Sequence, residues 1–176
     1  MNNIIGTIKA ETAATFIGPH INHFHFSGNE NHPDCIQIKK DLRDTIITLY
    51  RETGIYQYLS GVSLGIDLWA AEIVLSLKKE HPALELYSVV PYAGQADKWS
   101  SKNQARYARI LQQSTGVIKL RDGAYMPGCS RELNIFLVQN AHLLIAVFGR
   151  AYKPKSGSVH RINIARENGN RIIYIA

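Results

Sequence analysis

The amino-acid sequence predicts an α/β fold, a Rossmann-like three-layer sandwich with a mostly parallel central sheet. Strand-like and helix-like segments alternate along the chain, which is typical of a parallel sheet covered by helices. Glycine-containing turns follow several apolar strand-like segments, as they do where such sheets bind ligands. The 176 residues, 45% of them hydrophobic, suffice for one domain with a substantial core. We therefore expect a single domain over residues 1–176.

Each segment has a local reason for its assignment. Apolar runs predict strands at 12–18, 56–61, 84–91, 116–120, 142–149 and 171–176. Helical patterns cover 33–54, 66–82, 102–115, 131–141 and 158–168. In the first helix, Pro33 suits the first turn and Gly54 the C-terminal cap. Residues 1–11 could add an edge strand or remain loosely ordered.

The composition of the chain limits the kinds of partner that it can bind and the compartment in which we expect it. Lys and Arg total 20 against 14 for Asp and Glu, a formal charge of +6. This charge is compatible with an anionic ligand, with nucleic acid or with a simple solvated basic surface. No apolar run approaches the roughly 20 residues of a membrane span, and the N-terminus lacks a signal-peptide pattern. We expect a cytoplasmic protein with no membrane partner, in which Cys35 and Cys129 are reduced thiols.

The segment LSGVSLGIDLWAAE, residues 59–72, reads as a strand end, a turn and a helix start. A helix N-terminus suits an anion, and Gly61 and Gly65 would remove side chains from its approach. Ser60 and Asp67 flank the turn. The Asp67 carboxylate would repel a phosphate, so a ribose hydroxyl suits it better. The alternative is a strand-to-helix turn whose glycines serve packing alone.

The same segment resembles the Ser-Gly-x-x-x-Gly-x-Asp-x-x-Ala-Ala motif of the SLOG superfamily, which includes DNA-processing protein A and the LOG enzymes. VVPYAGQADKWSSKNQARY, YMPGC and HLLIAVFG resemble further segments of its YpsA-like branch, so the similarity runs from about Thr15 to the C-terminus. The resemblance implies a nucleotide-related ligand at the strand ends, with Pro91 and Tyr92 in one of the loops there. It also suggests a homodimer, for which the apolar helix Leu133–Val138 could serve.

The loops depart from the branch. The first, IGPHIN, keeps Gly18 and has His20 at the place of an arginine, and the last keeps Gly157 and a hydroxyl at Ser158. The glutamate that LOG enzymes use for base release falls on Arg161, which cannot replace it because a guanidinium stays protonated. Arg161 could instead bind phosphate bidentately, or it could simply face solvent.

The segment 19–35 holds several histidines and a cysteine. Imidazole and thiolate ligate zinc, yet the spacing matches no standard finger, so we predict no metal and no other cofactor. The preferred interpretation is a mobile loop that lines or covers the pocket. Its histidines would add positive charge at a pH near the ordinary imidazole pKa. Trp99 and Tyr107 could stack on a base or pack beneath the sheet edge. The histidines and the cysteine of segment 19–35 are His20, His23, His25, His32 and Cys35.

These observations predict a protein that binds a nucleotide or nucleotide-derived signal, such as a cyclic nucleotide or an ADP-ribose-like molecule, as a sensor or sequestering protein. The alternatives are single-stranded nucleic-acid binding and hydrolysis of an N-glycosidic bond in nucleotides; an enzyme is the less favoured reading. The predicted ligand-binding residues are Gly18, His20, Ser60, Gly61, Gly65, Asp67, Pro91, Tyr92, Gly157, Ser158 and Arg161.

Overall fold

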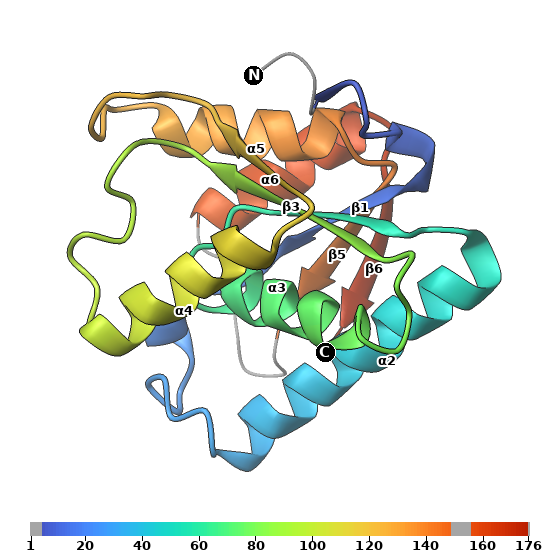
Figure 1. Cartoon of the computed structure of the whole chain (residues 1–176), viewed down its shortest axis with the longest axis horizontal. Helices are drawn as coiled ribbons and strands as arrows, with labels where there is room; N and C mark the ends of the chain where they lie inside the picture. The colour runs from blue at the N-terminus through green and yellow to red at the C-terminus, as the bar shows by residue number, and fades with distance from the viewer. Residues whose placement is uncertain (1–4, 149–155, 176) are drawn as a thin grey trace.

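A computed structural model describes residues 5–148 and 156–175 and has a six-stranded sheet at its centre (Figure 1). The strand order is β4-β3-β2-β1-β5-β6, and every strand pairing is parallel. This confirms the predicted Rossmann-like α/β fold. The strands are β1 (Ala13–Ile17), β2 (Gln57–Ser60), β3 (Glu85–Val90), β4 (Gly116–Lys119), β5 (Leu143–Val147) and β6 (Arg171–Ile175).

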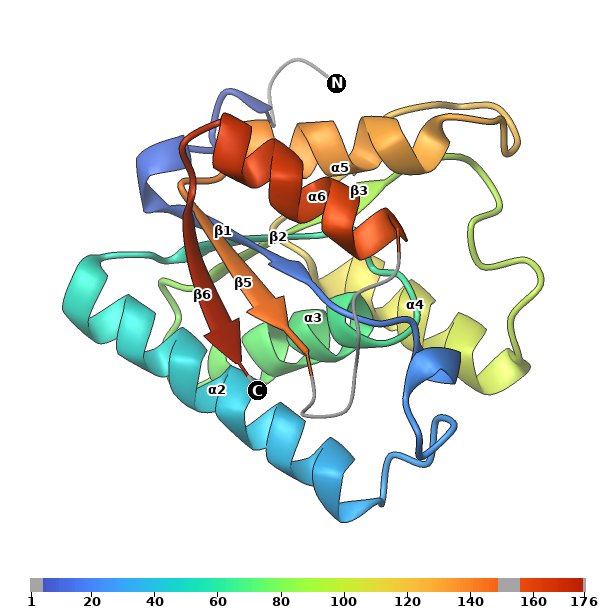
Figure 2. The same cartoon turned by 180° about the vertical axis from the view of Figure 1, so that it is seen from behind.

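Helices cover both faces of the sheet, so the molecule has three layers. Helices α2 (Pro33–Thr53), α3 (Ile66–Leu77) and α4 (Ser101–Gln113) lie on one face. Helices α5 (Cys129–Gln139) and α6 (Ser156–Glu167) lie side by side on the other (Figures 1 and 2). Short 3-10 helices η1 (Ala10–Thr12) and η2 (Ile21–His23) flank β1. No helix in the described part of the chain is long and apolar enough to cross a bilayer.

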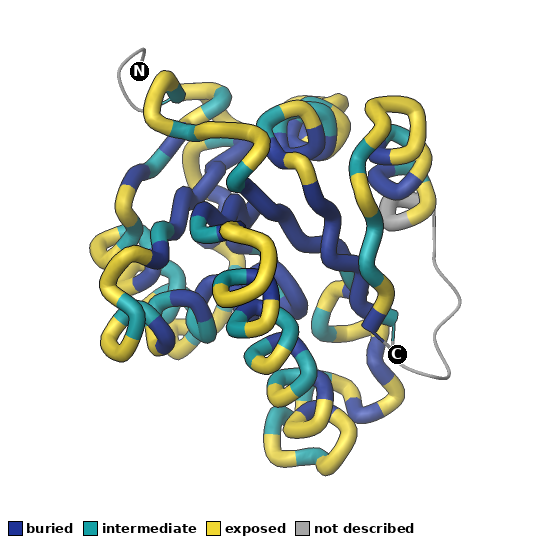
Figure 3. The backbone as a smooth tube through the Cα atoms, turned by 90° about the vertical axis from the view of Figure 1, so that its right-hand side faces the viewer, coloured by how far each residue is buried: buried dark blue, intermediate teal, exposed yellow. Residues whose placement is uncertain are grey.

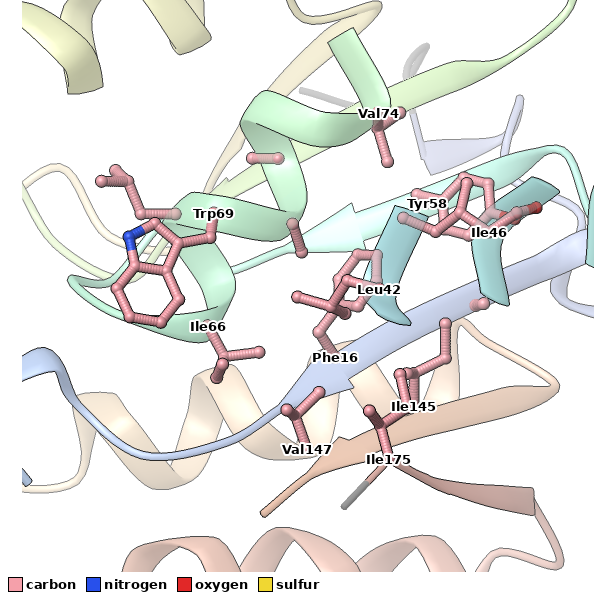
Figure 4. Close-up of a cluster of buried hydrophobic side chains, with 14 of the residues drawn as sticks. Phe16, Leu42, Ile46, Tyr58, Ile66, Trp69, Val74, Ile145, Val147 and Ile175 are labelled. Carbon is pink, nitrogen blue, oxygen red and sulfur yellow. The ribbon is translucent and has the colours of Figure 1, made fainter. Parts of the chain in front are cut away.

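The strands run through the interior while the helices expose their outer faces (Figure 3). All residues of β1, β2 and β5 are buried, which explains the nearly continuous apolar sequences of β1 and β5. Beneath α2 and α3, Phe16 stacks on Tyr58 with ring centroids 5.8 Å apart. Trp69 and Leu42 pack in the same cluster (Figure 4). The larger part of the core therefore lies between the sheet and these two helices.

The described part of the N-terminal segment, residues 5–11, adds no strand to the sheet, so the edge strand, one of the two alternatives for residues 1–11, is not formed there. The side chain of Gln57 on β2 holds the segment instead. Its Oε1 accepts from the Lys9 backbone N–H at 2.7 Å, and its Nε2 donates to the Thr7 carbonyl at 2.9 Å. Because Gln57 is buried, these bonds both satisfy its amide and fix the chain that enters β1.

Candidate ligand site at the ends of β1 and β5

The strand order reverses at β1: β2, β3 and β4 follow on one side of it, and β5 and β6 lie on the other side. In parallel α/β sheets the carboxyl ends at such a reversal are where ligands bind. Gly18 directly follows β1 at this point. A Cβ there would overlap the Ile66 side chain and lie 2.9 Å from the Val147 carbonyl oxygen. The missing side chain of Gly18 therefore lets the start of α3 approach the end of β5.

The turn between β2 and α3 is held by its own polar groups. The Ser60 hydroxyl accepts from the Val62 N–H at 3.0 Å and donates to the Asp67 carbonyl at 2.8 Å. The Gly61 carbonyl accepts from the Gln95 side chain at 2.9 Å. Val62 is fully buried with φ of +51°, a strained value for a β-branched residue. Ser60 thus positions the turn, and its hydroxyl is directed at protein atoms.

Gly65 occupies the position where the sequence predicted the approach of an anion. Its φ of +110° and ψ of −133° belong to a region open essentially to glycine alone. A Cβ there would overlap the Pro19 carbonyl oxygen and lie 2.9 Å from the Ile21 nitrogen. The Ile21 N–H donates to the Leu64 carbonyl at 3.3 Å, and His20 forms an isolated antiparallel bridge with Gly65. The backbone of the β1–α2 loop therefore lies against this glycine.

The loop itself is packed down by aromatic rings. Phe24 and Phe26 are buried and stack at 4.8 Å, and Phe24 contacts Trp69 of α3 at 5.4 Å. This loop passes over the start of α3 (Figure 2). His20 is exposed at the same place, and its Nδ1 accepts from the Asn22 N–H at 3.3 Å. The loop predicted to be mobile is thus anchored by two phenylalanines.

His20 does not add the positive charge that was expected of the histidines in this loop. Partial burial, with a smaller effect of His23, lowers the pKa of His20. Its imidazole is therefore neutral at physiological pH. Because Nδ1 accepts a hydrogen bond, the neutral ring carries its proton on Nε2. His20 can offer a hydrogen-bond donor to a ligand but adds no charge there.

A buried charged pair lies just beneath the end of β1. Arg161 of α6 and Asp67 of α3 are 4% and 9% exposed, and the Arg161 Nη1 is 3.6 Å from the Asp67 Oδ1. The guanidinium also donates from Nε to Asn134 Oδ1 at 2.7 Å and from Nη1 to the Phe16 carbonyl at 2.6 Å. Arg161 therefore has protein partners where the sequence predicted either a phosphate or solvent. Its contacts join α3, α5, α6 and β1 at one point.

The Asp67 carboxylate is under-satisfied. Burial raises its pKa, and the neighbouring Arg161 opposes that rise only in part. Its Oδ1 is buried and accepts no hydrogen bond. A buried carboxylate oxygen without a hydrogen bond costs free energy comparable to that of a lost bond, about 1–3 kcal/mol. Such an atom beside a topological reversal is a natural acceptor for a hydroxyl donor.

Other predicted residues lie elsewhere. Pro91 and Tyr92 follow β3, two strands away from β1, and Tyr92 meets Tyr125 edge-on at 5.3 Å. Trp99 and Tyr107 contact each other at 5.4 Å against the core, as the packing interpretation proposed. The first turn of α6 includes residues 157 and 158, the predicted Gly157 and Ser158, whose side chains lie outside the described residues.

Helix α5 does not present the apolar surface expected for a dimer. Its Leu133, Leu137 and Val138 are at most 4% exposed because they pack against the sheet. Only the partly exposed Ile135 and Phe136 remain on the outer side, where they line an open hollow of about 400 Å³. The predicted dimer contact through 133–138 is therefore wrong for the three core residues.

Two polar residues of the site were not predicted as functional. Asn134 receives the Arg161 guanidinium, and Gln95 fixes the Gly61 carbonyl. Both are buried, at 7% and 9% exposure. A polar side chain on the apolar face of a helix was the available signal for Asn134, since such a group needs a buried partner.

Comparison with known proteins agrees with this architecture. The family model YpsA, the YspA SLOG family, matches residues 24–175. A UPF0398 protein of Brevibacillus brevis is 33% identical over 124 residues, which cover 68% of this chain and 64% of the relative. A UPF0398 protein of Halalkalibacterium halodurans is 32% identical over 133 residues, which cover 75% of this chain and 69% of the relative. The chain thus spans slightly less than two thirds of the Brevibacillus relative.

Solved structures of similar fold include DNA processing protein A. The Helicobacter pylori protein, described for its single-stranded DNA binding mode, has a TM-score of 0.63 at 15% identity, over 100% of this chain and 69% of that one. The Streptococcus pneumoniae protein has a TM-score of 0.62 at 16% identity, over 93% and 50%. These likenesses concern the fold, whereas the family model covers most of the sequence. The chain therefore belongs to the YpsA family of SLOG proteins.

Proposed function

We propose that this protein binds a nucleotide or a nucleotide-derived signal, such as a cyclic nucleotide or an ADP-ribose-like molecule, over the carboxyl ends of β1 and β5, and that it acts as a sensor or sequestering protein. One observation carries the proposal. The Asp67 carboxylate, with a buried oxygen that accepts no hydrogen bond, lies at the reversal of the sheet and is held by Arg161. Ligands of Rossmann-like folds bind at such reversals, often through a carboxylate on a ribose hydroxyl.

The chemistry on both sides of the reversal fits a nucleotide. A ribose hydroxyl would donate to Asp67, while the neutral His20 would donate from Nε2 to a phosphate or base oxygen. Helix α6 follows β5 in the chain, and the positive end of a helix dipole favours an anion near its N-terminus. Arg161 is a positioning residue in this proposal, since its charge is already balanced by Asp67.

The β1–α2 loop limits access to Asp67. Pro19, His20 and Ile21 lie against Gly65 and cover the start of α3. Binding therefore requires the loop to shift, or the ligand to reach Asp67 from the β5 side. Residues 19–21 are joined to the Leu64–Gly65 turn by the isolated His20–Gly65 bridge, whose Ile21 N–H to Leu64 carbonyl hydrogen bond is 3.3 Å long and therefore weak. The firmer anchors, Phe24 and Phe26, lie further along the loop.

The test is a panel of nucleotides screened by thermal shift, followed by calorimetry with any molecule that raises the unfolding temperature. A ligand that binds only the folded state must raise it by mass action. Location is tested with His20→Glu, which should weaken binding at least about tenfold by setting a carboxylate beside the phosphate. His142→Glu is the matched control, because this exposed histidine precedes β5 at the opposite edge of the sheet.

Two results would contradict the proposal. The first is a panel in which no nucleotide changes the unfolding temperature. The second is an equal loss of affinity in both glutamate variants, which would show that only net charge matters. In that case we would turn to single-stranded DNA, for which the charge of +6 gives a reason. An oligonucleotide whose affinity falls steeply with salt would favour that function, because backbone contacts release counterions.

A further inference from the structure

We propose that His25, His32 and Asp34 form a binding site for one divalent transition-metal ion of the zinc class. The three residues lie where the β1–α2 loop enters α2, and their ligand atoms are all within 4.8 Å of one another. Within residues 5–148 and 156–175, no other group of three His, Cys, Asp or Glu residues is placed in this way. The site is separate from the proposed nucleotide site.

The distances from the two histidines to the carboxylate are close to those around a single ion. His25 Nε2 is 2.9 Å and His32 Nδ1 is 3.9 Å from the same Asp34 oxygen, Oδ2. Ligand bonds of about 2.0–2.2 Å in tetrahedral geometry set donor atoms roughly 3.3–3.6 Å apart. Both separations reach this range through shifts of a few tenths of an ångström in side chains that are partly exposed.

The two imidazoles are held in place by one buried ring. His32 stacks on Phe26 at 5.3 Å and 17°, and His25 meets the edge of the same ring at 5.2 Å and 78°. Phe26 is 7% exposed and stacks on Phe24 in the core. The histidines are therefore oriented by packing before any ion arrives, which lowers the ordering cost of binding.

The Nδ1 atom of His32 is unprotonated, and its lone pair caps α2. Its Nδ1 accepts the Asp34 N–H at 3.2 Å, so this nitrogen carries no proton. A metal ion would replace that long hydrogen bond with a coordinate bond. The positive end of the α2 dipole opposes a cation, but the Asp34 carboxylate supplies a full negative charge to offset it.

The donor set indicates the class of ion. Two imidazoles and one carboxylate suit zinc, nickel, copper or iron, whereas magnesium and calcium prefer oxygen ligands. Three protein ligands leave a position for water. Bound metal would join residue 25 of the loop to the start of α2 and so stabilise the loop that also carries His20. Cys35 contributes nothing, because it is buried in the core.

The experiment titrates the untagged full chain with Zn²⁺ by calorimetry and with Co²⁺ by visible absorption. We expect one ion per chain, a rise in unfolding temperature with Zn²⁺, and no competition from excess Mg²⁺. His25→Ala and Asp34→Asn should each weaken Zn²⁺ binding at least about tenfold. These two are preferred over a variant of His32, whose loss would also remove the α2 cap.

The matched control is the double variant His20→Ala/His23→Ala. These exposed histidines lie in the same loop with rings 5.9 Å apart, so they test whether any histidine pair suffices. The control should bind Zn²⁺ as the native chain does. The proposal is overturned if the native chain binds no Zn²⁺, if the control loses as much affinity as His25→Ala, or if Asp34→Asn binds normally.

Discussion

Replacing Arg161 by methionine tests the buried pair most directly. The change keeps the length of the side chain but leaves Asp67 in the interior without its cation. Breaking a buried pair in this way costs about 3–5 kcal/mol. Two hydrogen bonds, to Asn134 and Phe16, are lost as well and are included in that range. We expect the variant to fold with a stability reduced by this amount at about pH 8.

The loss should depend on pH with a definite sign. The pKa of Asp67 is raised in the folded state because burial outweighs Arg161, and removing the cation raises it further. A raised folded-state pKa means that stability is retained below the unfolded value, about 3.9, and declines as the pH rises through the folded value. Arg161→Met should therefore be closest to the native protein in acid and diverge from it toward neutral pH.

Urea unfolding followed by circular dichroism at several pH values measures this difference. The double variant Asp67→Asn/Arg161→Met removes both charges and should be at least about 1 kcal/mol more stable than Arg161→Met at about pH 8. Arg109→Met is the control, because the Arg109 side chain is 59% exposed and its ion pair should contribute less than about 1 kcal/mol. Equal losses in Arg109→Met and Arg161→Met, or a loss independent of pH, would refute the reasoning.

Three further predictions concern single positions. Gly65→Ala should lose more than about 1 kcal/mol because of its positive φ and the overlap with Pro19, whereas Gly123→Ala, with open space around it, should stay within about 0.5 kcal/mol in the same urea assay. The pKa of Glu30 is lowered to about 2, because hydrogen bonds and charges of Lys39 and Arg106 outweigh its desolvation. Glu30 should therefore contribute roughly 1–3 kcal/mol to the free energy of unfolding, and this contribution is lost as the pH falls from about 4.5 toward 2. Acid unfolding of Glu30→Gln should lack that contribution, and an acid-unfolding profile identical to that of the native protein would contradict the prediction. Chromatography of AMP after long incubation should detect no adenine, because Arg161 stands where LOG enzymes have glutamate, and adenine formation that is lost on mutation of Arg161 would overturn this.

The order of elements could be predicted from the sequence because it depends on local patterns. Helix α2 begins at Pro33, and Gly54 closes it in the left-handed conformation with φ of +72°, as the cap signals indicated. The predicted extension of α3 toward Pro82 was too long, since the helix ends at Leu77 and turns follow it. Strong helix formers after Leu77 gave no local sign of that end.

The site was less predictable because its contacts join distant segments. A glycine motif indicates that something approaches the backbone at Gly65, but not that the neighbour is Pro19 of another loop. Likewise, the position of Arg161 in the first turns of a helix does not reveal that Asp67, far away in the chain, faces it across the sheet end. Only the contact between side chains of α3 and α6, which come from opposite faces of the sheet and meet at the end of β1, decides between a surface cation and a buried one.

The contact of Phe24 with Trp69 has an optical consequence. The indole of Trp69 is fully buried beneath the loop, with the Lys39 ammonium 5.2 Å from its ring centroid. The chain contains only one other tryptophan, Trp99, so a Trp99→Phe variant would leave a single tryptophan, which can be excited selectively, under the loop. Displacement of the loop would bring water to that indole and shift its emission to longer wavelength. The fold thus carries its own reporter, with which opening of the loop can be followed in real time without an attached dye.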